Sequence, residues 1–294
     1  MYDNLPDEYR EQTVRLTSNE TGERVERPLQ DVLQERYAEI TAMDRSIGVL
    51  RDYLQKEGLR DNTLVWYCGD NGTPASAART GMTVRGQKGT MYEGGILVPG
   101  VMEWPARIKP SRSTHFGSVT SDILPTLCDL ADQPLPDRPL DGISLASMID
   151  GTMQVRQSPM FFWSFEAGKV FKADAQPYID PKLQEGTTPL VKMMNGKYTR
   201  TFRNFHYPTI SEAHFGGART IMDSRYKLVL DASSTNGSAI ELFDLTKDPA
   251  EENNLATTHP DIVEKMQFQL HDWQQSVLES LTGSDYEQRR TIVD

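Results

Sequence analysis

The residues best suited to chemistry are an aspartate, an asparagine and a lysine within one short stretch of the sequence. Asp70 and Asn71 follow a short apolar run, and Lys88 comes soon after them in a glycine-rich segment. A carboxylate and an amide carbonyl are hard oxygen ligands, which Ca²⁺ and Mg²⁺ prefer. An ammonium among glycines, whose backbone can approach a ligand closely, is suited to hold an anion or a developing oxyanion. The stretch therefore predicts a site for a divalent metal ion and an anion.

Each of these pieces has a simpler interpretation when it is taken alone. Asp70-Asn71-Gly72 is a common turn sequence, and two oxygen ligands are far fewer than the roughly six to eight that calcium takes. Lys88 can be a solvated surface lysine. Glu93, which precedes a pair of glycines, is interpreted as a structural hydrogen-bond acceptor rather than as a catalyst. The metal-and-anion site is therefore a hypothesis that depends on the combination.

The elements that must position these residues are those of an α/β protein. Leu64–Cys68 is an apolar run of β type, short enough for a buried strand of a parallel sheet. The carboxyl ends of such strands are where open α/β sheets place their ligands. Before this strand, an apolar stripe at spacings of three and four predicts an amphipathic helix from Leu33 to about Glu57, with Gly58 as its C-cap. Helix, turn and strand together make the αβ half of a βαβ unit.

The pattern continues after the glycine-rich stretch. Ile96–Pro105 predicts a short strand that a proline interrupts, which suits a sheet edge or a strand end. Ser121–Ala131 has apolar residues at helical spacing, and Ile143–Ile149 indicates a further short helix. Residues 1–30 are polar and broken by prolines and a glycine, so an irregular connection, with or without a short helix, is expected there.

A second region begins near Met160 and combines strands with a closing helix. The predicted strands are Met160–Phe165, Ala218–Met222, Tyr226–Leu230 and Ala239–Leu245, and the predicted helix runs from Pro260 to about Ser280. The stretch from about Glu166 to Gly217 has few periodic signals, and loops of such length are usually functional or disordered. We therefore expect an α/β domain over residues 1–158. Residues 159–294 are expected to form a small antiparallel sheet with a long loop (166–217) and a terminal helix.

Part of the long loop, Pro189–Arg219, is locally basic and rich in aromatic residues. One hypothesis is that it lines the entrance of the complete site and contacts an anionic substrate. The side chains that would do so are Arg200, Arg203, His206 and His214. A solvated surface excursion is an equally open interpretation.

Composition narrows the class of protein. The chain has 294 residues, which suggests roughly one or two domains, and its net charge of −11 argues against general nucleic-acid binding. No stretch approaches the ~18 apolar residues of a membrane span. The first residues are polar and acidic, without the pattern of a signal peptide. Cys68 and Cys128 lack a metal-type spacing and are expected to be buried free thiols, although a disulfide between them stays open.

An ordered series of motifs carries a resemblance to a known family. The motifs are Tyr37–Asp44, Asp70-Asn71-Gly72, Gly86–Gly95, Asp122–Leu127, Asp141–Leu145, Tyr226–Val229 and Glu241–Pro249. In this order they resemble the C-terminal part of a type I sulfatase, of the alkaline-phosphatase-like superfamily. The resemblance covers most of Tyr37–Trp273. Gly69 departs from the family, which usually has serine there.

The resemblance implies an alkaline-phosphatase-like α/β fold, with a mixed sheet flanked by helices, and the hydrolysis of a sulfate ester. It implies that Asp70 and Asn71 are ligands of a calcium ion, with Mg²⁺ also possible, and that Lys88 contacts the sulfate as a catalytic residue. In the family, a formylglycine made in a C-x-P-x-R motif cleaves the ester. That motif does not occur in this sequence, and its counterpart is expected in a part that would precede Met1.

The expected substrate of the complete enzyme is a sulfated small molecule or carbohydrate, with no nucleic-acid or membrane partner. This chain alone is expected to be inactive and to expose an apolar sheet edge. The family is often exported. Two alternatives stay open: a catalytically inactive remnant or binding module of the same fold, and a phosphoester or phosphonate hydrolase relative. Asn71 after Asp70 disfavours the second, because a histidine commonly follows the aspartate in phosphatase relatives.

Overall fold

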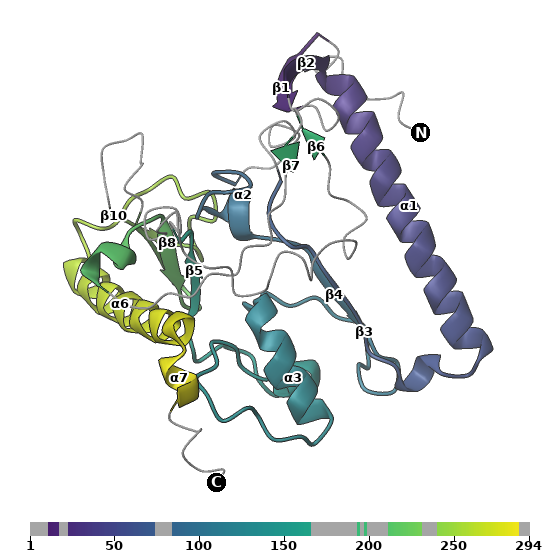
Figure 1. The fold of residues 1–294 in the computed structure, drawn as a ribbon. Helices are drawn as coiled ribbons and strands as arrows, with labels where there is room; N and C mark the ends of the chain where they lie inside the picture. Colours follow the sequence, from purple (N-terminus) through teal and green to yellow (C-terminus); the bar gives the residue numbers. More distant parts are fainter. Residues whose placement is uncertain are drawn as a thin grey trace.

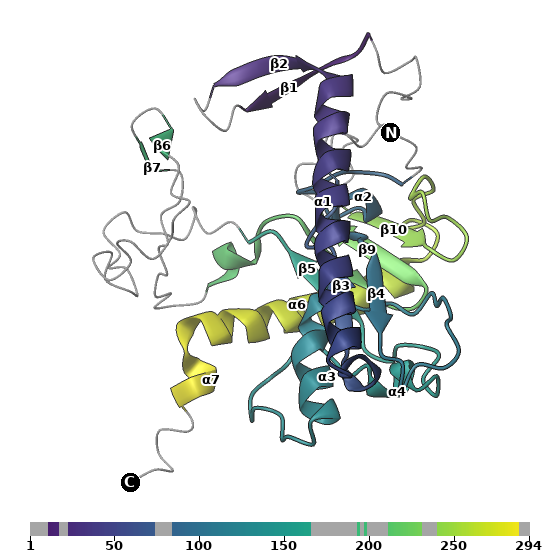
Figure 2. The same ribbon diagram turned by 90° about the vertical axis from the view of Figure 1, so that its right-hand side faces the viewer.

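The structure, a computed structural model, describes residues 11–17, 23–73, 84–165, 193–194, 197–198, 211–230 and 240–287. Within these ranges, a long N-terminal helix (α1) stands to one side of a body made of short strands and helices (Figures 1 and 2). The C-terminal helix α6 lies on the opposite side of that body. The α/β class predicted from the sequence is confirmed, although every strand pair described is antiparallel.

The predicted amphipathic helix is confirmed as α1, Leu29–Lys56, which begins about a turn earlier than expected. It ends in the motif that its glycine indicates. Gly58 adopts a φ of +69°, the Leu59 amide donates to the Leu54 carbonyl at 2.9 Å, and the Gly58 amide donates to the Gln55 carbonyl at 3.2 Å. This is a Schellman cap, in which a left-handed glycine lets the chain reverse and satisfies the last carbonyls.

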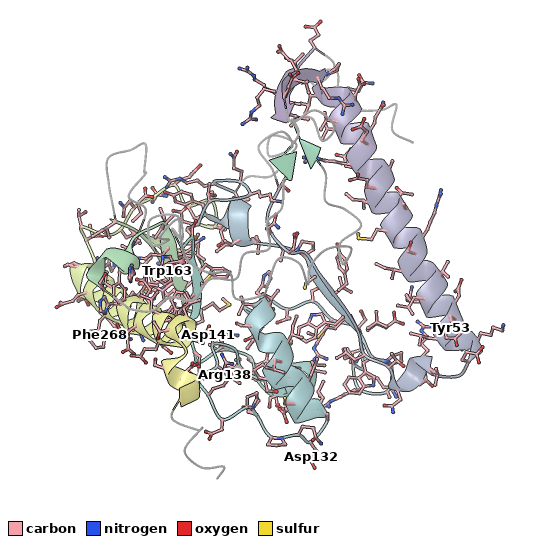
Figure 3. The ribbon with its side chains drawn as sticks, in the orientation of Figure 1. Tyr53, Asp132, Arg138, Asp141, Trp163 and Phe268 are labelled. Carbon is pink, nitrogen blue, oxygen red and sulfur yellow. The ribbon has the colours of Figure 1, made fainter. Side chains whose placement is uncertain are left out.

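The apolar stripe of α1 is exposed along the middle of the helix. Ile40 is 55% exposed, Leu50 47% and Tyr53 56%; Tyr53 is labelled near the end of the helix in Figure 3. The buried residues of α1 lie towards its two ends, at Leu29, Val32, Leu33 and Leu54. The periodicity thus predicts the helix correctly, while its central apolar face is uncovered in the described structure.

The strand before the candidate site is β3, Val65–Cys68, and its environment differs from the prediction. It pairs antiparallel with β4, Gly100–Glu103, and all of its residues are partly buried. The interpretation of a buried strand in a parallel sheet is therefore wrong. A parallel neighbour needs a crossover, usually a helix, whereas in the described residues between these strands the helix is the four-residue α2, Glu93–Ile96. That helical turn also explains why the predicted strand over Ile96–Pro105 begins only at Gly100.

A hairpin replaces the irregular connection predicted for part of residues 1–30. Strands β1 (Thr13–Thr17) and β2 (Arg24–Pro28) pair antiparallel. Val14 of β1 packs against buried Leu29 and Leu33 of α1. Polar and apolar residues alternate in TVRLT, whereas in RVERP it is exposure that alternates and not residue type. The high overall polarity of the segment conceals this period-2 signal.

The second region forms a four-stranded antiparallel sheet in the order β10-β9-β8-β5. Its strands are β5 (Met160–Trp163), β8 (Arg219–Met222), β9 (Tyr226–Leu230) and β10 (Ile240–Asp244). Helix α6, Pro260–Thr282, supplies Val263, Met266 and Leu270 to a core shared with this sheet. The four predicted strands and the closing helix are thus confirmed.

Smaller elements fill the remainder of the described chain. They are η2 (Arg60–Asn62), η3 (Thr120–Asp122), α3 (Ile123–Leu130), α4 (Ala146–Ile149), β6 (Met193–Met194), β7 (Lys197–Tyr198), η5 (Glu212–Phe215) and α7 (Ser284–Glu287). Helices α3 and α4 confirm the two short helices predicted in the first region. Most of the predicted loop 166–217 lies outside the described residues.

Asp122, at the start of α3, joins three separate segments of the first region. Its carboxylate is fully buried, forms a two-pronged ion pair with buried Arg156 at 2.7 and 3.0 Å, and accepts the backbone amides of Val119 and Ile143. Because every oxygen of the buried carboxylate is used, the charge is satisfied.

Two further expectations concern the cysteines and the membrane. Cys68 and Cys128 are free and only partly buried, so the disulfide alternative is not adopted in the structure. Among the helices of the described chain, none combines the length and apolarity that crossing a bilayer requires.

Candidate functional site

Two loop segments that are separate in the sequence lie side by side at the end of β3. The Gly72 amide donates to the Gly95 carbonyl at 2.8 Å, and the Lys88 amide donates to the Thr73 carbonyl at 2.8 Å. These bonds bring the Asp70-Asn71 turn next to the loop that carries Lys88. This loop runs from Arg85 to Glu93 and is called the lysine loop below. The three residues that the sequence predicts as a metal-and-anion site therefore belong to adjoining backbone segments.

The close approach of the two segments requires glycine. A Cβ atom at Gly72 would lie 2.0 Å from the carbonyl oxygen of Gly94, and one at Gly94 would lie 2.4 Å from the carbonyl oxygen of Gly86. No side chain fits at such distances from backbone atoms. The glycines of this stretch thus serve to pack the turn against the lysine loop.

The predicted site residues keep their side chains available. Asp70 and Lys88 are exposed and Asn71 is partly buried. None of the three side chains forms a hydrogen bond or an ion pair with another residue that the structure describes. Two hard oxygen donors on one segment and an ammonium on the adjoining segment suit a divalent cation with an anionic ligand. The donor chemistry therefore fits calcium, although two ligands leave most of its coordination to be filled.

No group of three or more His, Cys, Asp or Glu side chains that would hold a metal occurs among the described residues. The cation hypothesis accordingly rests on Asp70 and Asn71 together with ligands from elsewhere.

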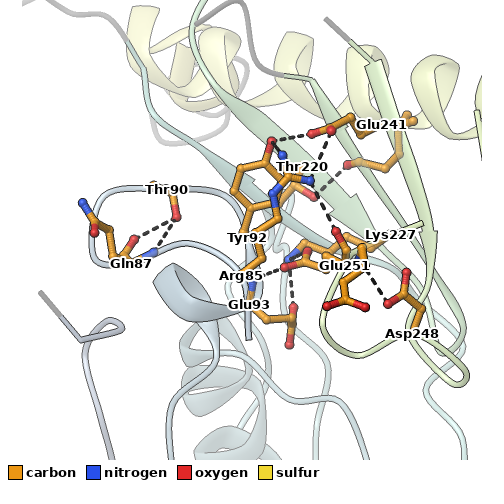
Figure 4. Close-up of polar contacts among 12 residues, drawn as sticks. Arg85, Gln87, Thr90, Tyr92, Glu93, Thr220, Lys227, Glu241, Asp248 and Glu251 are labelled. Atoms are coloured by element: carbon orange, nitrogen blue, oxygen red, sulfur yellow. Dashed lines mark hydrogen bonds and ion pairs between the residues drawn. The ribbon is translucent and has the colours of Figure 1, made fainter. Parts of the chain in front are cut away.

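The far side of the lysine loop is anchored by a buried charge cluster (Figure 4). The ammonium of Lys227, on β9, donates to the Glu93 carboxylate at 2.8 Å and contacts the Glu251 carboxylate at 2.8 Å. The other Glu251 oxygen accepts the Glu93 backbone amide at 2.7 Å. The Lys227 and Glu251 side chains are fully buried, and Glu93 is 7% exposed. The interpretation of Glu93 as a structural hydrogen-bond acceptor is confirmed.

Arg85, at the other end of the lysine loop, is anchored to the same sheet. Its guanidinium pairs with Glu241 of β10 at 3.1 Å, donates to the Tyr92 hydroxyl at 3.1 Å and lies over the Tyr92 ring at 3.9 Å. The Tyr92 hydroxyl in turn donates to Glu241. Burial raises the pKa of Glu251, because the surrounding protein disfavours its charged form. Both ends of the loop thus depend on charged groups from the second region.

Sequence reasoning missed these anchoring residues as a group. Lys227 and Glu241 were recognised only as parts of motifs, and Arg85 and Glu251 were given no role. One signal was available: Lys227 lies in the apolar run Tyr226–Leu230, where a buried lysine must have an anionic partner. Its partner Glu93 lies 134 residues away in the chain, so the pattern does not identify it.

The predicted substrate contacts are only partly described. Arg200, Arg203 and His206 lie outside the described residues. His214 lies in η5, where its Nδ1 accepts the backbone amide of Ser211 at 3.0 Å. This is a local contact within the short helix, and a role of His214 in substrate binding stays a prediction.

A shallow pocket of about 380 Å³ lies elsewhere, between α6 and the loop that precedes α4. Its lining includes Phe161, Phe268 and Trp273 together with Asp141 and Asp272; Phe268 and Asp141 are labelled in Figure 3. Trp273 stacks on Phe161 at 4.9 Å and donates its indole N–H to Asp141 at 2.8 Å. The carboxylates disfavour an anionic ligand here, so this pocket is not a second anion site.

Comparison with known proteins identifies the family. Residues 1–133 match the family described as Sulfatase. Human arylsulfatase A is 31% identical to the chain over 218 residues. The chain belongs to the sulfatase family. The resemblance to a type I sulfatase is thereby confirmed.

This chain matches only part of the length of its sulfatase relatives. The match to human arylsulfatase A covers 72% of this chain and 37% of the human protein. An uncharacterized sulfatase of Escherichia coli, YdeN, is 25% identical over 238 residues, which are 79% of this chain and 39% of the relative. The chain thus spans well under half the length of these relatives.

Several solved structures share the fold. A putative sulfatase of Bacteroides fragilis, yidJ, has a TM-score of 0.57 at 19% identity, with 87% of this chain and 45% of that chain covered. The protein Ps i-CgsB has a TM-score of 0.58 at 18% identity, with 81% and 42% covered. A structure in complex with its substrate, D-glucosamine-2-N,6-O-disulfate, has a TM-score of 0.57 at 20% identity, with 85% and 41% covered. At these identities the likeness extends to the fold.

Proposed function

We propose that this chain is the C-terminal portion of a sulfatase and carries part of an active site that hydrolyses a sulfate ester. The observation that supports this most is the pairing of the Asp70-Asn71 turn with the Lys88 loop through backbone hydrogen bonds at 2.8 Å. Because Asp70 and Asn71 lie on one of these adjoining segments and Lys88 on the other, the pairing supports a cation site next to an anion site. Family membership supplies the reaction class.

Within that site, each residue of this chain has a separate task. Asp70 and Asn71 hold a calcium ion through their side-chain oxygens. The ion, when bound, offsets the negative charge of the sulfate. The ammonium of Lys88 donates to a sulfate oxygen and stabilises the charge that develops as the ester bond breaks. The formylglycine nucleophile and further metal ligands come from residues outside this sequence, which has no C-x-P-x-R motif.

The substrate is proposed to be a sulfated carbohydrate or a sulfated small molecule. One structural neighbour was solved with its substrate D-glucosamine-2-N,6-O-disulfate, and a rat steryl-sulfatase is 33% identical over 132 residues. These relatives support both kinds of sulfate ester. Arg200, Arg203, His206 and His214 are proposed to contact the substrate at the entrance of the complete site.

The first test is the nucleotide sequence upstream of the codon for Met1. An open frame that encodes C-x-P-x-R supports the proposal. A frame without that motif favours the alternative of an inactive remnant or binding module.

The second test is turnover of 4-nitrophenyl sulfate and 4-nitrophenyl phosphate. We expect no turnover by this chain alone, and sulfate turnover once the chain is joined to the upstream part. Chelation of calcium, Asp70→Ala or Lys88→Ala should each abolish that turnover, while Lys109→Ala, a lysine change outside both site segments, should preserve it. Turnover by this chain alone contradicts the proposal, and a preference for the phosphate favours the phosphoester hydrolase alternative.

A further inference from the structure

The loop that carries Lys88 is held at both ends by the C-terminal sheet. At one end Arg85 pairs with Glu241 of β10. At the other, Glu93 is bound by Lys227 of β9 and by Glu251, which follows β10. Lys88 itself lies between these anchors and is exposed. The two ends of the loop are therefore held by groups that lie far from Lys88 in the sequence.

We propose that Lys227 and Glu251 are positioning residues for the anion site, which fix the Lys88 loop and, through it, the Asp70-Asn71 turn. The proposal rests on the proposed function only for the identity of the anion. A series of contacts supports it. The Glu251 carboxylate accepts the backbone amide of Glu93. Two residues later, the Gly95 carbonyl accepts the amide of Gly72, which immediately follows the Asp70-Asn71 turn.

The chemistry of the cluster favours positioning over simple packing. A buried ion pair adds little stability compared with apolar side chains of similar size, because both charges must leave water. It does impose direction, since each charge must meet its partner at hydrogen-bond distance. Glu93 is restrained twice, through its carboxylate by Lys227 and through its backbone amide by Glu251. Two restraints on one residue fix the orientation of the peptide at the start of α2.

The chain offers a matched control. Arg156 and Asp122 form another ion pair whose side chains are 2% and 0% exposed. Their contacts are with Val119, Ile143 and Ser158, none of which belongs to the lysine loop. Removal of this pair destabilises the fold without touching the proposed positioning contacts.

The test is amide hydrogen exchange on the 294-residue chain, with wild type, Glu251→Gln, Lys227→Met, Lys227→Arg and the control Arg156→Met. In Glu251→Gln and Lys227→Met, we expect the amides of Gly72, Lys88 and Gly94 to exchange on the order of tenfold faster than the change in global unfolding predicts. In Arg156→Met, these amides should change only in step with global unfolding. Lys227→Arg should restore most of the protection.

The proposal is overturned if the loop amides follow global unfolding in every variant. If Lys227→Met does not fold, the near-isosteric Glu251→Gln decides the matter. A second measurement uses the complete enzyme, assembled with its upstream part. Glu251→Gln should raise KM for a sulfate ester more than it lowers kcat, and unchanged KM and kcat also overturn the proposal. Absence of sulfate turnover would refute the proposed function, and the exchange result would still decide the positioning role.

Discussion

Individual residues in this protein differ in how their charge is accommodated. The Lys227 ammonium is buried between two carboxylates, whereas Asp244 is held by the half-exposed Arg225 at 2.8 Å and by Thr246. Hydrogen bonds from Arg225 and Thr246 lower the pKa of Asp244 from its ordinary value of 3.8 to about 2.

The stability that Asp244 contributes should disappear in acid. Because the pKa of Asp244 is lower in the folded chain than in the unfolded one, its contribution is complete above about pH 4 and is lost as the pH falls towards about 2. Urea unfolding midpoints measured between these limits should fall more steeply for wild type than for Asp244→Asn. Parallel slopes for the two proteins would contradict this assignment.

A single methyl group should disturb the junction of the two site segments. In Gly72→Ala the new Cβ atom would lie 2.0 Å from the Gly94 carbonyl oxygen, so the turn must move away from the lysine loop. Overpacking of this kind costs about 1–3 kcal/mol. Gly100→Ala is the control, because no atom lies within 4 Å of its Cβ position. Denaturant unfolding of both variants measures the difference, and equal stabilities would contradict the prediction.

At the scale of elements, α1 is the unusual one. It is a long helix whose cap and ends are well formed, while its central apolar residues are exposed. Helices of this kind are normally stabilised by the surface on which the apolar face packs. Exposed apolar patches of soluble proteins tend to associate.

Substitution on this face should reduce self-association and leave folding intact. Ile40 and Leu50 are 55% and 47% exposed, and exposed substitutions usually change stability by no more than about 0.5 kcal/mol. Light scattering of the double variant Ile40→Gln/Leu50→Gln should therefore show less aggregation than wild type at the same concentration. Leu33→Gln, at a position 1% exposed, should destabilise the chain instead. Unchanged aggregation in the double variant would refute a role for the face.

Elements with a local periodic signal could be predicted from the sequence, and long-range pairings could not. Helix α1, its Gly58 cap and helix α6 follow from spacing and from glycine and proline chemistry. The antiparallel pairing of β3 could not be predicted, because it depends on the path of the chain between β3 and its partner β4. The hairpin β1–β2 was missed because its alternation is short and mostly polar. In the candidate site, the prediction of Asp70, Asn71 and Lys88 depends on residue type together with the family resemblance, while the Lys227 cluster depends on contacts between distant segments.

At the scale of the whole molecule, the C-terminal sheet anchors the loop that carries Lys88 in the candidate site. The match to human arylsulfatase A covers 37% of that protein, so the activity of the whole enzyme is a proposal for this chain. The division at residue 158 stays a prediction from the sequence. Contacts nevertheless cross it: Arg85–Glu241 and Glu93–Lys227 both join the lysine loop to the sheet.

This crossing has a consequence for evolution and for engineering by recombination. If the C-terminal sheet were exchanged for that of a relative, the Glu93 carboxylate would enter an interior that no longer contains its cation, unless lysine and glutamate were inherited together. Viable chimaeras should therefore keep these positions as a set, whatever the crossover point between them. The C-terminal sheet, although it carries none of the proposed reacting groups, would then be inherited together with the loop that it positions.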